Sequence, residues 1–175
     1  WYTNLGQVID RNQYPPDLFP LENTLRSQLG LSMLEERGRI SFDDILKRKY
    51  NEKLLLADRV KRDLVHLASG QTVDGLDLTE AAQVLEAWDN TASPNSVGSV
   101  LFVTFWNLYI KMTDTPFETA WEEARPNATP FGIGDDEAAL NALAAAMRDL
   151  SEKAGSIRVA WGDLFRIRRG DLDIP

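Results

Sequence analysis

Apolar residues recur at helical spacing along most of the chain and are densest in residues 97–112. There they cover nearly the whole helical circumference, a pattern typical of a buried central helix. In residues 78–88 the apolar side chains again follow helical spacing, with Thr79, Glu80 and Glu86 on the opposite side. The sequence therefore predicts an amphipathic helix followed by a buried one.

The link between these two helices is rich in turn-forming residues. Asp89-Asn90 ends the first helix, and Ser93-Pro94-Asn95-Ser96 interrupts the pattern before the second. Asn95 or Ser96 can cap the second helix, because each side chain can accept a backbone N–H. We therefore expect a tight helical hairpin.

Three further helices are predicted before this hairpin. The first covers residues 22–36 and ends at Arg37-Gly38, the second starts after Ser41, and the third covers residues 54–68. The acidic first turn of the second helix, Asp43-Asp44, suits the positive end of a helix dipole. The residues expected to face inward are Leu25, Leu29, Met33 and Leu34 in the first helix, and Phe42, Ile45 and Leu46 in the second.

The remaining segments complete a mainly α chain with one domain. Proline and asparagine predict an extended segment over residues 1–20, and residues 21–112 form the helical core. Residues 113–134 are a long loop with one helical turn through 118–123. An alanine-rich helix follows over 135–155, capped by Asp135-Asp136 and closed by Gly155. Residues 156–175 contain two short strands, over 157–161 and 166–170.

Length and composition limit the classes of protein to which this chain can belong. A chain of 175 residues, 43% of them hydrophobic, can bury one sizeable core. The net charge of −8 argues against nucleic-acid partners and anionic membranes, which attract basic surfaces. The absence of cysteine excludes disulfides, thiol catalysis and thiolate metal sites. The apolar run of residues 97–112 is shorter than the ~20 residues needed to cross a bilayer, so we interpret it as core.

Few side chains offer local chemistry. His66 is the only histidine and lies inside a predicted helix. A metal site with two histidine ligands is therefore excluded, and a catalytic Ser-His-Asp triad could use only this residue. The acidic clusters lie at helix starts, where capping is a better explanation than metal binding, so no metal site is predicted. Five aromatic residues could line an acyl pocket, but their helical spacing favours core packing: Trp88, Phe102, Phe105, Trp106 and Tyr109.

Two sets of arginines stand out. Arg26 interrupts the apolar stripe near Leu25 and Leu29, and it is either a solvent-facing residue or part of a site. A second set near the C-terminus is interpreted as a surface charge network that needs no ligand. It contains Arg166, Arg168 and Arg169 with Asp163, Asp171 and Asp173.

Several short motifs occur in a characteristic order. They are an aromatic and proline-rich start over residues 1–17, Arg26 followed by Arg39-Ile40-Ser41 and Asp43-Asp44, then Leu56-Ala57-Asp58-Arg59, Leu85-x-x-Trp88-Asp89, and finally Trp161-Gly162-Asp163 with Arg169-Gly170-Asp171-x-x-Ile174-Pro175. Together they resemble the β-chain of penicillin amidases and acyl-homoserine lactone acylases, which are N-terminal nucleophile hydrolases. The last motif favours the acylase branch.

The resemblance implies that the chain is an internal segment of the β-chain of a larger αββα hydrolase. Such an enzyme is a heterodimer cut from one precursor, lies in the periplasm or outside the cell, and cleaves N-acyl amides with the N-terminal serine of its β-chain. That serine and the oxyanion asparagine lie outside this chain, since Trp1 is no nucleophile. Of the family's site only Arg26 carries over, where its charge would help to orient the asparagine or the substrate.

The resemblance also implies the partners, which are the α-chain, the rest of the β-chain and a small-molecule N-acyl amide. No cofactor is expected in this segment, and the family allows a structural calcium in the full enzyme. The segment alone is expected to be inactive. A different class of function stays open, because a helical interaction or scaffold module would equally lack a local triad, a metal site and a phosphate loop.

Overall fold

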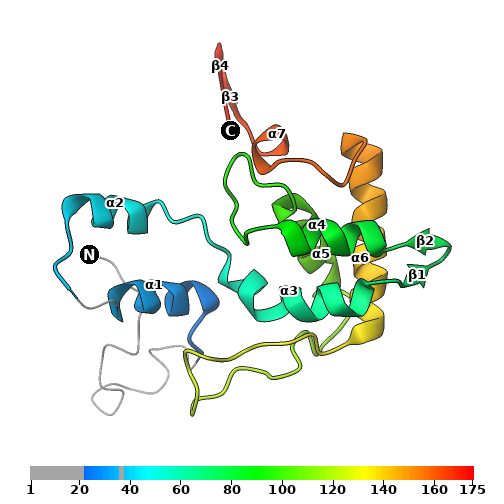
Figure 1. The fold of residues 1–175 in the computed structure, drawn as a ribbon, viewed down its shortest axis with the longest axis horizontal. Helices are drawn as coiled ribbons and strands as arrows, with labels where there is room; N and C mark the ends of the chain where they lie inside the picture. The colour runs from blue at the N-terminus through cyan, green and yellow to red at the C-terminus, as the bar shows by residue number, and fades with distance from the viewer. Residues whose placement is uncertain (1–21, 36–37) are drawn as a thin grey trace. The chain divides into compact units, whose positions relative to one another are not determined.

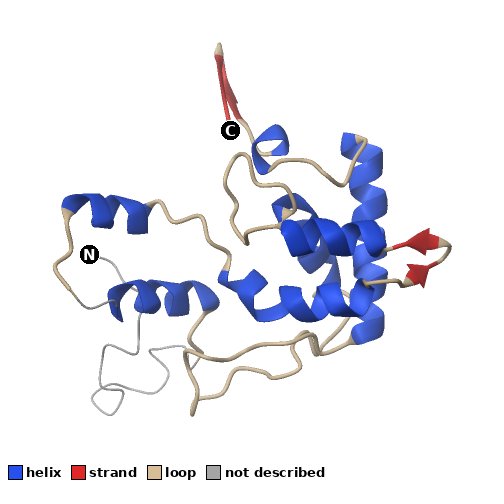
Figure 2. Cartoon of the chain, viewed as in Figure 1, coloured by secondary structure: helices blue, strands red, loops and turns tan. Residues whose placement is uncertain are grey.

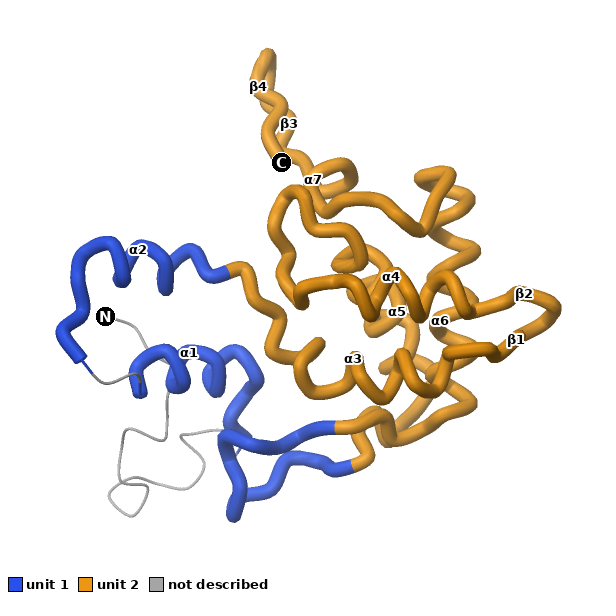
Figure 3. The backbone as a smooth tube through the Cα atoms, in the orientation of Figure 1, with its two compact units in different colours: residues 1–51, 119–131 blue, residues 52–118, 132–175 orange. Residues whose placement is uncertain are grey.

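The computed structural model describes residues 22–35 and 38–175, so the expected extended segment at residues 1–20 lies outside the described residues. The chain divides into two compact units, shown in Figure 3. One contains residues 1–51 and 119–131, and the other contains residues 52–118 and 132–175. We describe each unit separately.

Helices dominate the described part of the chain, which confirms the mainly α class (Figure 2). Strands occur only as two short antiparallel hairpins in this part. Figure 1 labels the elements. In chain order they are α1 (Leu25–Glu35), α2 (Phe42–Lys49), α3 (Leu55–Ala68), β1 (Thr72–Val73), β2 (Leu76–Asp77), α4 (Thr79–Ala87), α5 (Ser99–Tyr109), α6 (Asp136–Ala154), α7 (Trp161–Leu164), β3 (Ile167–Arg169) and β4 (Leu172–Ile174).

The core of the larger unit is built around α5. This helix packs along α6, while α3 packs on α4 (Figure 1). The predicted buried central helix is therefore confirmed, although it is shorter at both ends than the apolar run. Its buried residues are Ser99, Val100, Leu101, Phe102, Phe105 and Tyr109.

The start of α5 differs from the prediction. Its N-cap is Gly98, with a φ of 111° and no side-chain cap, so the predicted cap by Asn95 or Ser96 is wrong. The reason is that Ser96 is engaged elsewhere, since its hydroxyl accepts a hydrogen bond from Trp88 Nε1 at 2.8 Å. The backbone at Gly98 passes so close to Trp88 that a Cβ there would lie 2.7 Å from Trp88 Cβ. Only glycine fits both the left-handed φ and this approach.

Helix α6 has the predicted ends. The Asp135 side chain accepts a hydrogen bond from Ala138 N at 3.0 Å, and Gly155 closes the helix with a φ of 72°. The start of α6 is also tied to the end of α5, because Asp135 N donates to the Tyr109 hydroxyl at 3.0 Å. Small side chains on the buried face of α6 let the two helices approach closely: Ala138, Ala139, Ala142, Ala144 and Ala146.

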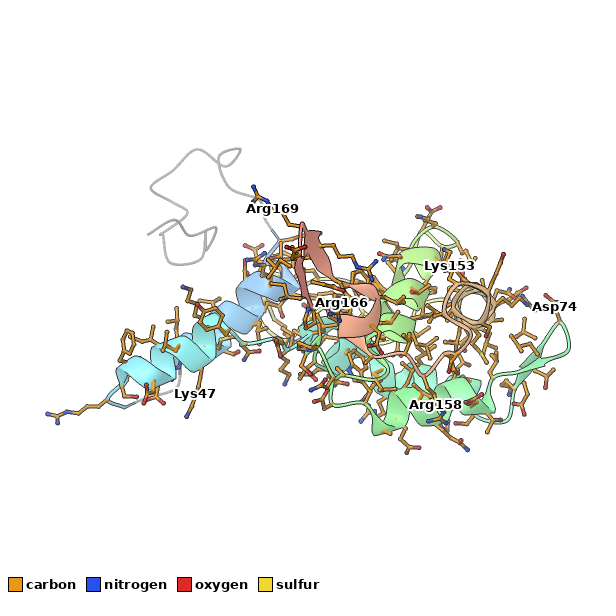
Figure 4. The ribbon with its side chains drawn as sticks, turned by 90° about the horizontal axis from the view of Figure 1, so that it is seen from above. Lys47, Asp74, Lys153, Arg158, Arg166 and Arg169 are labelled. Atoms are coloured by element: carbon orange, nitrogen blue, oxygen red, sulfur yellow. The ribbon has the colours of Figure 1, made fainter. Side chains whose placement is uncertain are left out.

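The hairpin of β1 and β2 was not predicted. Thr72 pairs with Asp77, and Val73 pairs with Leu76. Asp74 and Gly75 form the turn with φ values of 49° and 77°, and Figure 4 shows Asp74 at the tip. An Asp-Gly pair between apolar residues is a strong signal for a hairpin of this type.

The predicted strand over residues 157–161 is wrong. Only Ala160 pairs, in an isolated bridge with Val97, and α7 starts at Trp161. The segment is instead held to the α4–α5 link, because Trp161 N donates to Ser96 O at 3.1 Å and Gly162 N donates to Pro94 O at 2.8 Å. The second predicted strand, over 166–170, is confirmed as β3, which pairs with β4.

In the smaller unit, α2 begins as predicted but faces differently. Ser41 and Asp44 form a capping box, with Ser41 Oγ accepting from Asp44 N at 3.1 Å. Phe42 and Ile45, expected to face inward, are 72% and 50% exposed. The apolar stripe of α2 is real, but no apolar layer covers it within residues 22–35 and 38–175.

The predicted helical turn over residues 118–123 is also wrong. Thr119 and Phe131 form an antiparallel bridge, with Thr119 N donating to Phe131 O and Phe131 N donating to Thr119 O, both at 3.0 Å. These two bonds require extended backbone at Thr119. Elsewhere, among the helices that the structure describes, none combines the length and the apolar character needed to cross a bilayer.

We predict that Gly98→Ala destabilises the chain more than Gly155→Ala does. Both residues have positive φ, which costs an alanine about 1–2 kcal/mol, but only at Gly98 does the added Cβ collide with a neighbour. Overpacking adds about 1–3 kcal/mol at such a site. Urea unfolding followed by tryptophan fluorescence measures both variants, and equal free energies of unfolding would contradict the steric argument.

We predict that Asp135→Ala lowers the free energy of unfolding by about 0.5–2 kcal/mol, because it removes the side-chain cap of α6. Asp136→Asn is the matched control, since Asp136 lies in the same first turn but is not the cap. Its loss of charge near the helix start costs only about 0.3–1 kcal/mol. Thermal unfolding compares the two variants, and an Asp135 variant no less stable than the control would rule out the cap.

Candidate functional site

The one site residue suggested by the sequence, Arg26, lies in the first turn of α1 with an exposed side chain. The start of this helix is fixed locally, because Thr24 Oγ1 accepts a hydrogen bond from Ser27 N at 3.2 Å and Thr24 O accepts one from Gln28 N at 2.9 Å. Arg26 therefore lies in a first helical turn whose start is fixed by hydrogen bonds to Thr24.

A buried polar cluster anchors α1 to residues 119–131 within the smaller unit. Gln28 is the buried residue of α1, and its Nε2 donates to Asn23 O at 2.9 Å and to Thr129 O at 2.7 Å. Asn23, also buried, donates from Nδ2 to Asn127 Oδ1 at 2.6 Å. Residues two apart on a helix point in nearly opposite directions. Because Gln28 points toward residues 119–131, the Arg26 side chain points away from them.

This arrangement corrects the predicted inward face of α1. Leu25, Leu29 and Met33 are only half-buried, and Leu34 is 62% exposed. The helix is held by hydrogen bonds from a polar residue and not by its leucine stripe. The missed signal was Gln28 itself, a polar residue at a position that the spacing places beside Leu25.

The segment that receives Gln28 is braced by its own contacts. Thr129 is fully buried, and its hydroxyl donates to Arg125 O at 2.9 Å and accepts from Glu122 N at 2.8 Å. Arg125 pairs with Glu122 at 2.8 Å, and this hydrogen bond lowers the pKa of the Glu122 carboxyl below its ordinary value. The carbonyl of Thr129 is thereby held in place for Gln28.

In the larger unit, the residues of the Leu85-x-x-Trp88-Asp89 motif organise the link after α4. Trp88 Nε1 donates to Thr91 O and Ser96 Oγ, both at 2.8 Å. Asp89 Oδ1 accepts from Thr91 N at 3.1 Å and from Thr91 Oγ1 at 2.9 Å. Partial burial raises the pKa of Asp89, but the hydrogen bonds from Thr91 and Ser96 outweigh it and leave this pKa below the ordinary value.

A cavity of about 510 Å³ opens beside this link. Its charged groups are Asp89, which is held by Thr91, and Arg158, whose Nε lies 2.9 Å from Glu80 Oε1. His66 is exposed on α3 and does not line the cavity, so neither lining serine has an imidazole base. The cavity is lined by Val84, Ala87, Trp88, Asp89, Ser93, Asn95, Ser96, Val97 and Arg158.

The other candidates have structural roles. Core packing is confirmed for Trp88, Phe102, Phe105 and Tyr109, which are buried, with neighbouring rings 5.1 to 6.1 Å apart. Trp106, the fifth aromatic residue, is half-buried, and its ring lies 5.6 Å from that of Tyr109. The acidic helix starts contain the caps described above. Within the described residues, no group of three His, Cys, Asp or Glu side chains gathers where it could hold a metal.

The predicted charge network near the C-terminus is present in part. Asp173 Oδ1 lies 2.6 Å from Arg166 Nε and 3.6 Å from Arg168 Nε. Hydrogen bonding from Arg166 lowers the pKa of Asp173 below its ordinary value. The Arg168 pair joins the two strands of the C-terminal hairpin, and the Arg166 pair joins β4 to the residue just before β3.

Comparison with known proteins identifies the family. The sequence profile described as penicillin amidase matches residues 3–173, nearly the whole chain. The chain is also 25% identical over 161 residues to the acyl-homoserine lactone acylase PvdQ of Pseudomonas fluorescens (strain Pf0-1). That alignment covers 86% of this chain and 20% of the relative, so the chain spans about a fifth of the relative's length.

The family match includes the segments in which the motifs of the sequence lie, from Arg26 through Trp88-Asp89 to Trp161-Gly162-Asp163. It is independent of the fold, and it agrees with the resemblance drawn from those motifs. The chain belongs to the penicillin amidase family.

Proposed function

We propose that this chain is a helical segment of the β-chain of an N-terminal nucleophile hydrolase that cleaves N-acyl amides. The family match over residues 3–173 carries the proposal. The acylase PvdQ is named for acyl-homoserine lactones, and this favours a substrate of that kind or a related fatty-acyl amide over a β-lactam. The alignment with only 20% of that relative is what a segment of a larger enzyme would give.

In this proposal the remainder of the enzyme supplies the reacting groups. An N-terminal serine attacks the amide carbonyl, its own α-amine takes the proton, and a backbone N–H with an asparagine side chain stabilises the oxyanion. The present segment contributes framework and one supporting charge. Arg26 suits that role, because its side chain is exposed on α1 while Gln28 fixes the same helix from the other side.

The proposal extends to location and metal content. The parent enzyme would be exported to the periplasm or secreted, as the family resemblance implies. The family resemblance allows a structural calcium in the parent, and no three His, Cys, Asp or Glu side chains gather within the described residues. We therefore assign no residue of this chain to a metal.

We predict that Arg26→Ala in the full-length parent lowers kcat/KM for a long-chain N-acyl homoserine lactone by about 10²-fold or more, because a charge beside the oxyanion groups is lost. The melting temperature should not change, since the Arg26 side chain is exposed. Arg62→Ala is the matched control, because the Arg62 side chain is 96% exposed on α3. Turnover unaffected by Arg26→Ala would instead support a scaffold role.

We predict that the 175-residue chain alone hydrolyses a long-chain acyl amide no faster than a heat-denatured sample, because the nucleophile lies outside it. Release of the free amine or lactone, followed by mass spectrometry, measures this directly. The parent enzyme assayed under the same conditions is the positive control. Hydrolysis by the isolated chain above the denatured background would show that it contains its own catalytic groups and would overturn the proposal.

A further inference from the structure

The two faces of the C-terminal hairpin differ in chemistry. Arg168 pairs with Asp173, and the flanking pairs are Ile167 with Ile174 and Arg169 with Leu172. Paired residues share a face, and neighbours along a strand alternate between faces. One face therefore carries Arg168 and Asp173. The other, which we call the apolar hairpin face, carries Ile167, Leu172, Ile174 and Arg169.

The polar face is already satisfied within the chain. Asp173 pairs with Arg166 and Arg168, and Arg166 Nη1 also donates to Gly162 O at 2.8 Å at the base of the hairpin. These contacts hold the hairpin to α7. The polar residues of this face therefore have ion-pair partners within the chain, and the exposed apolar residues lie on the opposite face.

The apolar hairpin face is open. Ile167, Leu172 and Ile174 are 61%, 50% and 42% exposed, and Leu164 at the end of α7 and Phe165 after it are also exposed. Two strands alone are marginally stable in water and need a third strand or a packed layer. No described residue provides either, since β3 and β4 form a sheet of their own that extends away from the helices of its unit (Figure 3).

Arg169 adds a charge requirement. Figure 4 shows it at the far end of the hairpin, with Arg166 nearer the base. Arg166 and Arg168 pair with Asp173, whereas Arg169 enters no ion pair among the described residues. A covering surface that matches this face is apolar and carries a carboxylate opposite Arg169.

We propose that the apolar hairpin face docks on the remaining polypeptide of the parent hydrolase, on an apolar surface with a carboxylate facing Arg169. The inference rests on the proposed function, in which this chain is a segment of a larger enzyme. The chain spans about a fifth of the length of its relative, so in the proposed parent most of the polypeptide lies outside this segment and could cover the face. A second copy of the chain is the weaker occupant, since two chains of net charge −8 repel each other.

The 175-residue chain contains no cysteine, so an introduced thiol is the only one within it, and analysis of the hairpin peptide isolates the signal in the parent. Leu172→Cys places a thiol on the apolar hairpin face, and Arg168→Cys places the matched control on the polar face of the same hairpin. Each variant is made in the 175-residue chain and in the full-length parent, and the rate of maleimide labelling is followed by mass spectrometry of the hairpin peptide. Both sites are exposed in the chain, so neither change should prevent folding.

We expect the thiol at position 172 to react at least about tenfold more slowly in the parent than in the isolated chain, because a covered thiol reacts only through local opening. The thiol at position 168 should react at similar rates in both. Equal rates for position 172, or equal protection of both positions, would overturn the docking of this face. Protection that appears in the isolated chain as its concentration rises would also overturn it, in favour of a second copy.

Labelling does not depend on turnover, so the two proposals can fail separately. A parent that hydrolyses acyl amides but leaves position 172 reactive overturns the docking alone. A parent that protects position 172 but shows no amidase activity overturns the proposed function and leaves the interface standing. Leu172→Ser provides a second measurement, which should lower the melting temperature of the parent and leave that of the isolated chain unchanged.

Discussion

The larger unit depends on the close packing of Trp88 against the backbone of Gly98. Trp88 is the C-cap of α4 and Gly98 is the N-cap of α5, so this one contact fixes where the two helices end and begin. The indole N–H then ties the link between them through Thr91 and Ser96. The Trp88 ring contacts Phe102, and ring contacts continue through Phe105 to Tyr109 at the end of α5. The Tyr109 hydroxyl accepts a hydrogen bond from the backbone N–H of Asp135, the N-cap of α6. The position of α6 therefore follows from a contact at the other end of α5.

Burial on other helices of the same unit decides which helices hydrophobic spacing can predict in full. Helices α3, α4, α5 and α6 bury their apolar sides on one another, so hydrophobic spacing was enough to predict them. Hydrophobic spacing also predicted α1 and α2, but it did not predict whether other residues cover their apolar sides. Phe42 and Leu34 show that periodicity identifies the apolar side of a helix and cannot tell whether its partner lies in the same chain. The alternation at residues 157–161 failed for another reason, because backbone bonds to Pro94 and Ser96 override it.

The site was less predictable than the fold. Arg26 is proposed from a family resemblance, since a single arginine in a leucine stripe has no local signature. The helix that carries Arg26 is anchored by a cluster of Gln28, Asn23 and Thr129. Gln28 and Thr129 are 101 positions apart in the sequence, so hydrophobic spacing could not predict their contact. By contrast, the Asp74-Gly75 turn was visible in the sequence and was overlooked. Local backbone requirements can be predicted from residue type, whereas contacts distant in sequence require the fold.

The way α1 is anchored bears on the role proposed for Arg26. An apolar contact tolerates sliding and rotation, whereas hydrogen bonds are directional in distance and angle. Gln28 makes two such bonds to backbone carbonyls, at Asn23 and Thr129, and the second carbonyl belongs to a segment braced by Thr129, Glu122 and Arg125. Rotation of α1 about its axis would break the bond to Thr129 in a buried place, where an unpaired polar group costs about 1–3 kcal/mol. The helix is thus fixed in orientation as well as in position, and the exposed Arg26 is presented in one direction. For a residue whose proposed task is to orient another group, that constraint matters more than added stability.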